Sequence, residues 1–215
     1  MTPAGRVLCS IGTGPHEELL DLAGPTFEGY ARRHGYSLDL RSDVRGLGER
    51  PVAWAKIALI RDLLEEHELV VWIDADAMIV DPTEDIAGAG MRPIDLVCHE
   101  IGGVSVPNTG VMVVRRCRAT NRLLERIWSR TQHLHHRWWE NAAMIEVLGG
   151  DPDVGLRTRR ERSRARRLVG ALDPRWNSIP TCPTTDPAIV HLAGVSHDER
   201  RSTMQRLAER AMRQV

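Results

Sequence analysis

Apolar positions recur along the chain in two patterns, which predict strands and helices in alternation. Short, nearly continuous apolar runs are typical of strands buried on both faces of a sheet. Apolar residues three and four positions apart are typical of helices that pack one face on a core. The predicted strands are 6–11, 37–40, 69–73, 95–98, 109–114 and 188–192. The predicted helices are 16–34, 52–67, 118–131, 140–148 and 197–213.

This order of elements indicates an α/β fold with a mostly parallel central sheet, because strands that alternate with helices form βαβ units. With 215 residues, the chain is expected to form a single domain over 1–215. Within 16–34, Gly24 and Pro25 interrupt the helical pattern. A proline in a helix interior removes a hydrogen bond, so we expect a kink or two shorter helices there.

Two carboxylates follow the most apolar strand. The run Leu69–Ile73 leads directly into Asp74, Ala75 and Asp76. In an extended segment, acids two positions apart point to the same side, where they repel each other unless a cation lies between them. Ligands of open α/β sheets bind beyond the carboxyl ends of the strands. The pattern predicts a divalent metal, Mn²⁺ or Mg²⁺, that holds a phosphorylated substrate. Alternatively, the acids only cap a turn.

His191 ends another apolar run and precedes Gly194. A histidine beside apolar residues is most often a hydrogen-bonded core residue. At the end of a strand it is also a candidate third metal ligand, and an imidazole favours manganese over magnesium.

Two further pairs are candidates for contacts with a sugar. Asn108 and Gly110 begin a predicted strand, where they either form an ordinary turn or hold sugar hydroxyls and let the backbone approach a ligand. Glu140 and Asn141 begin a predicted helix. They present a carboxylate and an amide to a reacting sugar, or the acid simply favours the positive end of the helix. Trp138 and Trp139, which precede them, are either core residues or a platform for a sugar ring.

Three residues are candidates for contacts with a nucleotide donor. Lys56 is the only lysine among 29 basic residues, and it is placed to reach phosphate or the acidic pair unless it is an ordinary surface lysine. Ser10 and Thr13 follow the first strand, where turn formation is the simpler explanation.

Composition says little about partners. The 29 basic and 29 acidic residues give no net charge, which argues neither for nor against a nucleic-acid partner. We expect none, because the candidate residues favour a nucleotide-sugar donor. The four cysteines lack metal-binding spacing and are predicted to be buried free thiols of a cytoplasmic protein. No run is long enough for a membrane span or a signal peptide. The Arg-rich segment 157–167 is predicted to be a mobile loop, solvated or in contact with phosphates.

The order of six segments resembles glycosyltransferase family thirty-four, the galactosyl/xylosyl/mannosyl transferases. The resemblance extends over about 7–194. Its segments are YARRHGYSLDL, VAWAKIALIRDLL, VVWIDADAMIV, NTGVMVVRR, WWENAAMIEVL and IVHLAG. It implies a GT-A fold, a nucleotide-sugar donor, manganese, and transfer with retention of the anomeric configuration.

The resemblance also implies roles for the candidate residues. Metal ligands would be Asp74, Asp76 and His191. Residues that would contact the donor by this resemblance are Lys56, Asp74, Asn108 and Gly110. Ser10, Thr13 and Ala75 are further donor-binding candidates from their positions in this sequence. Catalytic residues would be Glu140, Asn141 and Lys56.

The sequence departs from this family in three respects. Glu140–Asn141 replaces an Asp–Gln pair, so the donor sugar is open to change. His197 lies near the place of a lysine that helps to neutralise the leaving diphosphate. We also expect no membrane anchor of the kind found in the Golgi relatives. The identity of the acceptor, a small molecule or a saccharide, therefore cannot be carried over from the family.

The expected reaction moves a hexose or pentose from a UDP- or GDP-linked donor to an acceptor hydroxyl. Retention would come from attack on the same face as the leaving phosphate, which is slightly favoured, or from Glu140 as a nucleophile. Alternatives are a metal-dependent nucleotidyltransferase and a non-catalytic nucleotide-sugar binding protein. The oligomeric state is open.

Overall fold

The computed structural model describes residues 5–156 and 164–212, and it has the expected α/β architecture. Six strands form the central sheet in the order β2-β1-β3-β6-β5-β7. β6 alone among these six runs against its two neighbours, so the sheet is mostly parallel, as predicted. The strands are β1 (Arg6–Ile11), β2 (Ser37–Arg41), β3 (Leu69–Ile73), β5 (Ile94–Ile101), β6 (Val104–Arg115) and β7 (Val169–Ala171).

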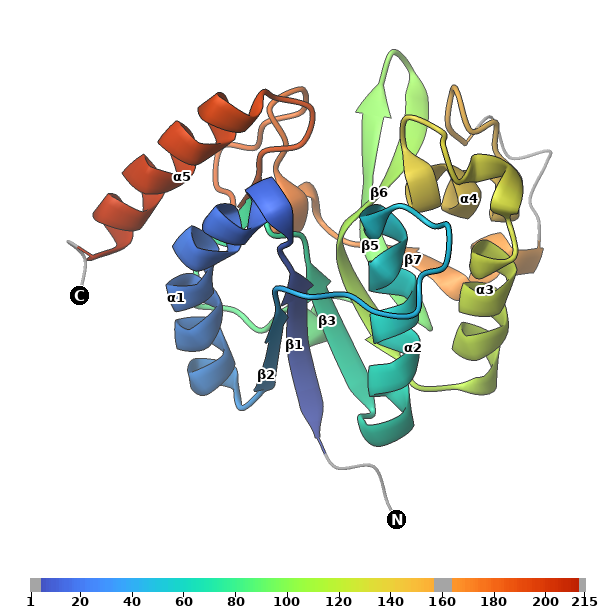
Figure 1. Cartoon of the computed structure of the whole chain (residues 1–215), viewed down its shortest axis with the longest axis horizontal. Helices are drawn as coiled ribbons and strands as arrows, with labels where there is room; N and C mark the ends of the chain where they lie inside the picture. The colour runs from blue at the N-terminus through green and yellow to red at the C-terminus, as the bar shows by residue number, and fades with distance from the viewer. Residues whose placement is uncertain (1–4, 157–163, 213–215) are drawn as a thin grey trace.

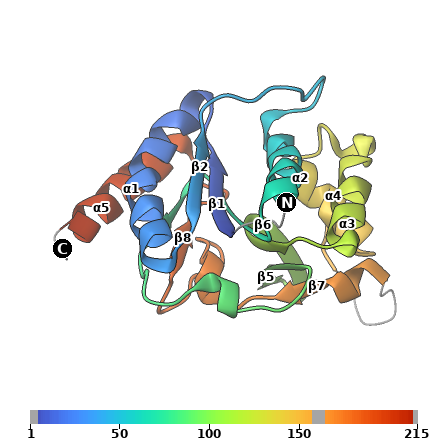
Figure 2. The same cartoon turned by 90° about the horizontal axis from the view of Figure 1, so that it is seen from below.

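Helices cover both faces of this sheet (Figure 1). One side carries α1 and α5, and the other carries α2, α3 and α4, as the view from below also shows (Figure 2). The helices are α1 (Glu17–His34), α2 (Ala55–Glu66), α3 (Arg118–Trp128), α4 (Trp139–Val147) and α5 (His197–Met212). Within the described residues, no helix combines the length and the apolar character that crossing a bilayer requires.

The strands produce two cores because successive side chains point to opposite faces. In β3, Val70 and Trp72 pack with α2, α3 and α4, whereas Val71 and Ile73 pack with α1 and α5. This double burial explains why the sequence 69–73 is apolar at every position.

A second sheet of two short strands lies beyond the end of β3. It pairs β4 (Ala77–Ile79) with β8 (Ile189–His191) in antiparallel register. β4 and β7 were not predicted from the sequence, because three residues carry too little pattern to distinguish a strand from a loop. The β4–β8 pairing brings the region after β3 to the C-terminal part of the chain.

Three expectations about local structure were wrong in whole or in part. Of the kink or two shorter helices expected at Pro25, the second does not occur, because α1 is one helix from Glu17 to His34. β6 begins at Val104, well before the predicted 109, because β5 and β6 form a hairpin whose turn has Gly102 and Gly103 at positive φ. Of the four cysteines, all free, only Cys9 is fully buried.

The Arg-rich segment 157–167 divides into two parts. Residues 157–163 lie outside the described part of the chain. Arg164 to Arg167 belong to a short 3-10 helix, η6 (Arg164–Leu168), that precedes β7, so this part is not an irregular loop.

Candidate metal and donor site

The predicted metal ligands meet at the carboxyl end of β3. The chain turns at Asp74, whose backbone N–H donates to Gly110 O (2.8 Å) and whose carbonyl accepts from Ala77 N (3.0 Å). β4 then pairs Ala77 with His191, and Leu192 N donates to Asp76 O (2.9 Å). The acidic pair therefore lies in a turn, not in the extended strand we assumed, and both carboxylates face His191.

The three side chains form a compact cluster. One oxygen of Asp74, one oxygen of Asp76 and one ring nitrogen of His191 all lie within 4.8 Å of one another. His191 Nε2 is 3.3 Å from Asp76 Oδ1 and 3.8 Å from Asp74 Oδ2. Asp76 and His191 are buried, whereas the Asp74 side chain is 24% exposed. The cluster is therefore reachable from one side.

Each carboxylate has one oxygen engaged and presents the other to His191. Lys56 Nζ and Trp72 Nε1 donate to Asp74 Oδ1 at 2.8 and 2.7 Å. Arg200 Nε, from α5, lies 3.1 Å from Asp76 Oδ2. The oxygens that remain, Asp74 Oδ2 and Asp76 Oδ1, are the two nearest the imidazole.

The charges of this cluster support one another. Burial alone would raise the pKa of the Asp76 carboxyl, but His191 and Arg200 lower it well below its usual range. Burial alone would lower the pKa of His191, but Asp76 and Asp74 raise it. A protonated imidazole therefore adds to Lys56 and Arg200 in offsetting the charge of the two acids.

The donor set fits a small divalent cation. Two carboxylates and an imidazole suit Mn²⁺, and Mg²⁺ also takes carboxylates. Ligands about 2.1 Å from such an ion lie roughly 3 Å apart at right angles, so the observed separations require only small side-chain movements. Asn177 Oδ1 accepts from His191 Nδ1 at 2.8 Å, which leaves Nε2 directed at the acids. Outer partners of this kind orient metal-binding histidines.

Lys56 is a buried residue, not a surface lysine. It is 6% exposed, and its ammonium lies 2.8 Å from Asp74 Oδ1 and 3.0 Å from Glu140 Oε1. Burial would lower the pKa of Lys56, but these two carboxylates raise it above its ordinary value. Lys56 therefore remains charged and joins the metal side of the site to α4.

Glu140 is also buried. Its Oε1 accepts from Thr109 Oγ1 (3.0 Å) and pairs with Lys56, while Oε2 has no hydrogen-bond partner among the described residues. Burial raises the pKa of Glu140, and Lys56 opposes this shift only in part. The neighbouring Asn141 is half-buried, and its Oδ1 accepts from Thr109 N (3.1 Å).

Gly110 allows another group to lie close to the backbone, as predicted, but this group is the His191 side chain and not a ligand. A Cβ at this position would lie 2.1 Å from His191 Cε1 and 2.9 Å from Asn108 Oδ1. Any residue larger than glycine would displace the imidazole. The residues beside this glycine, Asn108 and Thr109, reach Asn177 and Glu140, so the start of β6 lies between the metal side and the α4 side.

Among the described residues, no side-chain hydrogen bond or ion pair joins the remaining predicted residues to this cluster. Ser10 is fully buried in β1, and its hydroxyl lacks a partner within the described chain. Thr13 follows β1 and is half-buried, and Ala75 is buried in the turn between the acids. His197 donates to or accepts from Glu18 (2.6 Å) instead of approaching the acids. Arg200 and Asn177 were not predicted from the sequence, because neither belongs to a motif.

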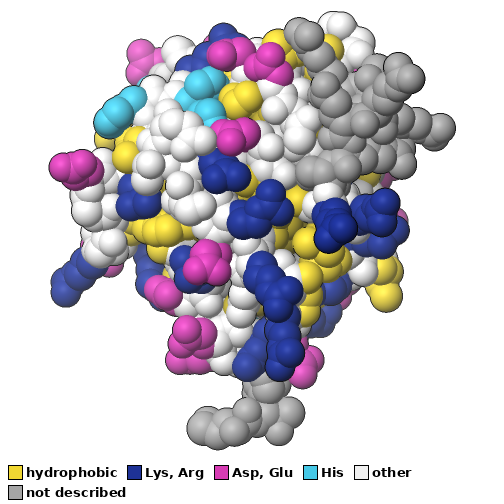
Figure 3. Space-filling model, turned by 90° about the vertical axis from the view of Figure 1, so that its right-hand side faces the viewer, with side chains coloured by type: hydrophobic (Ala, Val, Ile, Leu, Met, Phe, Trp, Pro, Cys, Tyr) yellow, Lys and Arg dark blue, Asp and Glu magenta, His cyan; other side chains and the backbone are white. Residues whose placement is uncertain are grey.

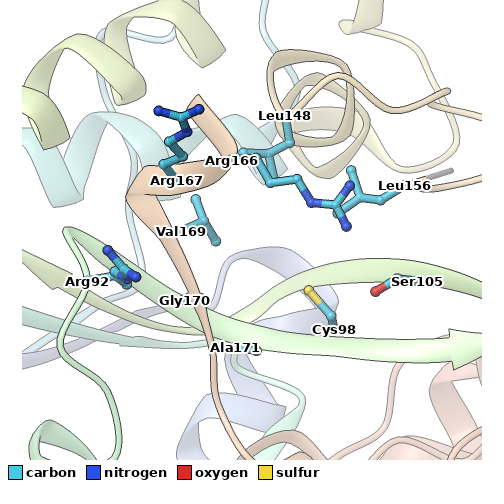
Figure 4. A pocket seen from close by; sticks show the side chains of 10 residues that line it. All are labelled: Arg92, Cys98, Ser105, Leu148, Leu156, Arg166, Arg167, Val169, Gly170 and Ala171. Carbon is cyan, nitrogen blue, oxygen red and sulfur yellow. The ribbon is translucent and has the colours of Figure 1, made fainter. Parts of the chain in front are cut away.

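Another hollow, of about 460 Å³, lies between β5, β6, β7 and η6. It belongs to the side of the molecule where arginines are frequent at the surface (Figure 3). Arg92, Arg166 and Arg167 line it, but their side chains extend in different directions (Figure 4). They do not converge on one point as the groups around His191 do.

Comparison with known proteins identifies the fold. A glycosyltransferase involved in the glycosylation of the major capsid of PBCV-1 superposes with a TM-score of 0.70 at 16% identity, over 94% of this chain and 100% of the other. The galactosyltransferase LgtC, in complex with donor and acceptor sugar analogs, superposes with a TM-score of 0.61 at 10% identity, over 94% and 95% of the two chains. The fold is GT-A, as predicted.

Comparison of sequences finds a match to one family over part of the chain. The model of the galactosyl transferase GMA12/MNN10 family matches residues 27–102, a segment that contains Lys56, Asp74 and Asp76. This confirms the predicted resemblance to family thirty-four. The remaining predicted ligand, His191, lies outside the matched segment.

Two curated relatives with similar sequences are described as glycosyltransferases. An uncharacterized alpha-1,2-galactosyltransferase of Schizosaccharomyces pombe is 38% identical over 76 residues, 33% of this chain and 18% of the relative. A probable glycosyltransferase 5 of Oryza sativa subsp. indica is 32% identical over 146 residues, 58% of this chain and 32% of the relative. The chain thus spans at most about a third of the length of these relatives.

Proposed function

We propose that this chain is a metal-dependent, retaining glycosyltransferase. It would move a hexose or pentose from a UDP- or GDP-linked donor to an acceptor hydroxyl, with 1–215 as a single catalytic domain. The observation that carries the proposal is the convergence of Asp74, Asp76 and His191 at the carboxyl edge of a GT-A sheet. Family thirty-four and the two curated relatives support a transferase over a nucleotidyltransferase or a binding protein.

The two acids would hold the metal through the oxygens that face His191. Lys56 and Trp72 restrain one oxygen of Asp74, and Arg200 restrains one of Asp76, so the other oxygen of each is presented in a fixed direction. When bound, Mn²⁺ or Mg²⁺ would supply Lewis-acid stabilisation of the charge that develops on the leaving diphosphate.

Asn108 and Asn141 would orient the transferring sugar. Asn108 Oδ1 already accepts from Gly110 N (2.8 Å) and Asn177 Nδ2 (3.1 Å), so its own amide NH₂ is the group left for a hydroxyl. Asn141 likewise uses its oxygen internally, on Thr109 N. Both side chains therefore offer donors, which suits the hydroxyl oxygens of a sugar.

The surroundings of Glu140 favour attack on the same face as the leaving phosphate. A carboxylate nucleophile needs an oxygen that reaches the anomeric carbon. Both Glu140 oxygens are buried, and Oε1 is engaged by Lys56 and Thr109. We assign Glu140 the role of a counter-ion that holds Lys56 against Asp74.

Trp139 is a candidate platform for a saccharide acceptor. It is 45% exposed, although most large apolar side chains of the described chain are buried. Its backbone has a φ of 42°, the only positive value among the described non-glycine residues. Such strain concentrates at functional sites, and an exposed indole beside Glu140 offers an apolar face to a sugar ring.

The test is donor turnover with Mn²⁺ across a panel of nucleotide sugars, followed by mass spectrometry. Asp74→Ala and Asp76→Ala are expected to lose metal-dependent turnover by about 1000-fold or more, whereas Asp62→Ala, an exposed control on α2, keeps it. Near-normal turnover by either site variant refutes the metal assignment.

The anomeric configuration of the product, read by NMR, tests retention directly. Glu140→Gln separates the two routes, because a nucleophile cannot be an amide. Same-face attack predicts a modest loss of rate, whereas a loss of many orders of magnitude with an intact fold would make Glu140 the nucleophile.

A further inference from the structure

Asn177 lies fully buried between two residues of the site that come from distant parts of the chain. Its Oδ1 is 2.8 Å from His191 Nδ1, and its Nδ2 is 3.1 Å from Asn108 Oδ1. Both ends of the amide are therefore engaged, one on the metal side and one on the sugar side.

The directions of the hydrogen bonds that link Gly110, Asn108, Asn177 and His191 follow from one backbone group. Gly110 N–H can only donate, and it points at Asn108 Oδ1 (2.8 Å), so that atom must be the amide oxygen. An oxygen only accepts, so Asn177 must present its NH₂ to Asn108. The other end of Asn177, its oxygen, then faces His191, which must carry a proton on Nδ1.

We propose that Asn177 is a positioning residue that fixes the tautomer of neutral His191 with its proton on Nδ1. The lone pair of that ring then lies on Nε2, the nitrogen next to Asp76 and Asp74. Where it concerns metal binding, this inference rests on the proposed function. The same amide sets Asn108, so one residue orients both a metal ligand and a group assigned to the sugar.

Local structure holds Asn177 in place. It ends a short 3-10 helix, η7 (Pro174–Asn177), that begins with Pro174 and is capped by Asp173, whose Oδ1 accepts from Arg175 N (2.9 Å). The Arg175 guanidinium is itself paired with Asp81 at 2.8 Å. A proline at the first position and a capped start restrict this turn before any ligand is present.

The next residue joins this turn to the strand of His191. Ser178 N donates to Ile189 O and its carbonyl accepts from His191 N, both at 2.9 Å. The residue that follows Asn177 is therefore hydrogen-bonded to the backbone of His191. This bond holds the Asn177 amide next to the imidazole before any ligand binds.

The experiment separates the acceptor atom of Asn177 from its donor atom. Asn177→Leu removes both, whereas Asn177→Asp keeps an oxygen for His191 and loses the NH₂ for Asn108. Mn²⁺ affinity, measured by electron paramagnetic resonance on the full chain without nucleotide sugar, is expected to fall about 10- to 100-fold in Asn177→Leu. Asn177→Asp is expected to stay within a few-fold of the unmodified protein for Mn²⁺, but to raise the KM of the donor. Asn121→Ala, an exposed asparagine on α3, is the control.

A second readout needs no metal. The ¹⁵N shifts of the His191 ring, at a pH where it is neutral, are expected to show Nδ1–H in the unmodified protein and in Asn177→Asp. A mixture of tautomers is expected in Asn177→Ser, which keeps a polar group if the leucine variant does not fold. Equal Mn²⁺ affinity in the unmodified protein and in Asn177→Leu, or an Nε2–H ring in the unmodified protein, overturns the inference. If the unmodified protein binds no Mn²⁺ but shows Nδ1–H, the metal proposal fails and the tautomer assignment stands.

Discussion

The buried carboxylates on the two sides of Asp74 are neutralised by different groups. On the α4 side, the Lys56 ammonium lies between Asp74 and Glu140, within 3.0 Å of both carboxylates. On the β8 side, Asp76 faces His191, and Arg200 engages the outer oxygen of Asp76. Each side carries a permanent cation, Lys56 on one and Arg200 on the other, but the β8 side also includes an imidazole whose charge changes with protonation.

This difference indicates what each side is for. Lys56 cannot leave, so its side is a fixed element that sets the position of Asp74. The His191 side keeps two carboxylate oxygens and one ring nitrogen directed at a shared space, and a divalent cation can replace the proton of the ring there. The proposed cation would bind on the His191 side, while the Lys56 side holds Asp74 in place.

The largest expected effect comes from removing the fixed cation. Lys56→Met leaves the buried Glu140 without a counter-ion, and we expect the free energy of unfolding to fall by about 3–5 kcal/mol. Lys56→Met/Glu140→Gln is expected to recover part of this loss, since it removes the stranded charge. Urea denaturation measures both.

The exposed pair Arg45–Asp43 supplies the control, because Arg45→Met is expected to change the free energy of unfolding by less than about 0.5 kcal/mol. If Lys56→Met were as mild as this control, the α4 side would not be a fixed element.

The next effect concerns a second buried histidine, His99 on β5, which contrasts with His191. It is 3% exposed, and its Nε2 has no partner among the described residues. Burial, with a smaller effect from His191, lowers the pKa of His99 to about 4. Below pH 6.5 the unfolded chain takes up a proton that the folded chain does not, so stability is full above pH 6.5 and falls as the pH drops towards 4.

His99→Leu is expected to remove up to roughly 3 kcal/mol of this acid sensitivity, because a pKa difference of about 2.5 units sets the limit. Thermal denaturation between pH 4 and 7 measures it, with the exposed His135→Leu as the matched control. An unchanged pH profile in His99→Leu would mean that this ring is solvated or partnered.

The smallest expected effect separates the two sides most finely. Arg200→Gln removes a charged hydrogen bond to the buried Asp76 and is expected to cost about 1–2 kcal/mol of stability in metal-free protein. Saturating Mn²⁺ is expected to reduce the difference in the free energy of unfolding between Arg200→Gln and the unmodified protein, since a bound cation also neutralises Asp76. Arg206→Gln, an exposed residue of the same helix, controls for helix stability. If this difference in the free energy of unfolding does not change with Mn²⁺, the role of Arg200 is purely structural.

Much of this architecture could be predicted from the sequence because burial on two faces leaves a local signal. The apolar run 69–73 predicted β3, and its position before Asp74 and Asp76 predicted a metal site. His191 came from the same rule applied to another strand end. The three side chains do converge, although the turn at Asp74 was not foreseen.

The rest depends on contacts that leave no local pattern. A lone asparagine such as Asn177 is indistinguishable from a turn residue until η7 is folded against β8. Arg200 is one arginine in an Arg-rich helix, and only the packing of α5 brings it to Asp76. For Glu140, the position beside the site was predicted, but the inward direction of its carboxylate depends on Lys56 and Thr109.

The pairing of β4 with β8 also sets the order in which the site can form as the chain is made. Asp76 and His191 are separated by about half of the chain, so closing this loop is entropically costly and comes after the local elements have formed. Until β8 docks, the two acids have Lys56 but not the imidazole. Before β8 is made, a nascent chain therefore carries two of the three proposed metal ligands, and His191 joins them only when the later part of the chain arrives. β8, which is made after β3 and β4, is thus the strand that completes the proposed ligand set.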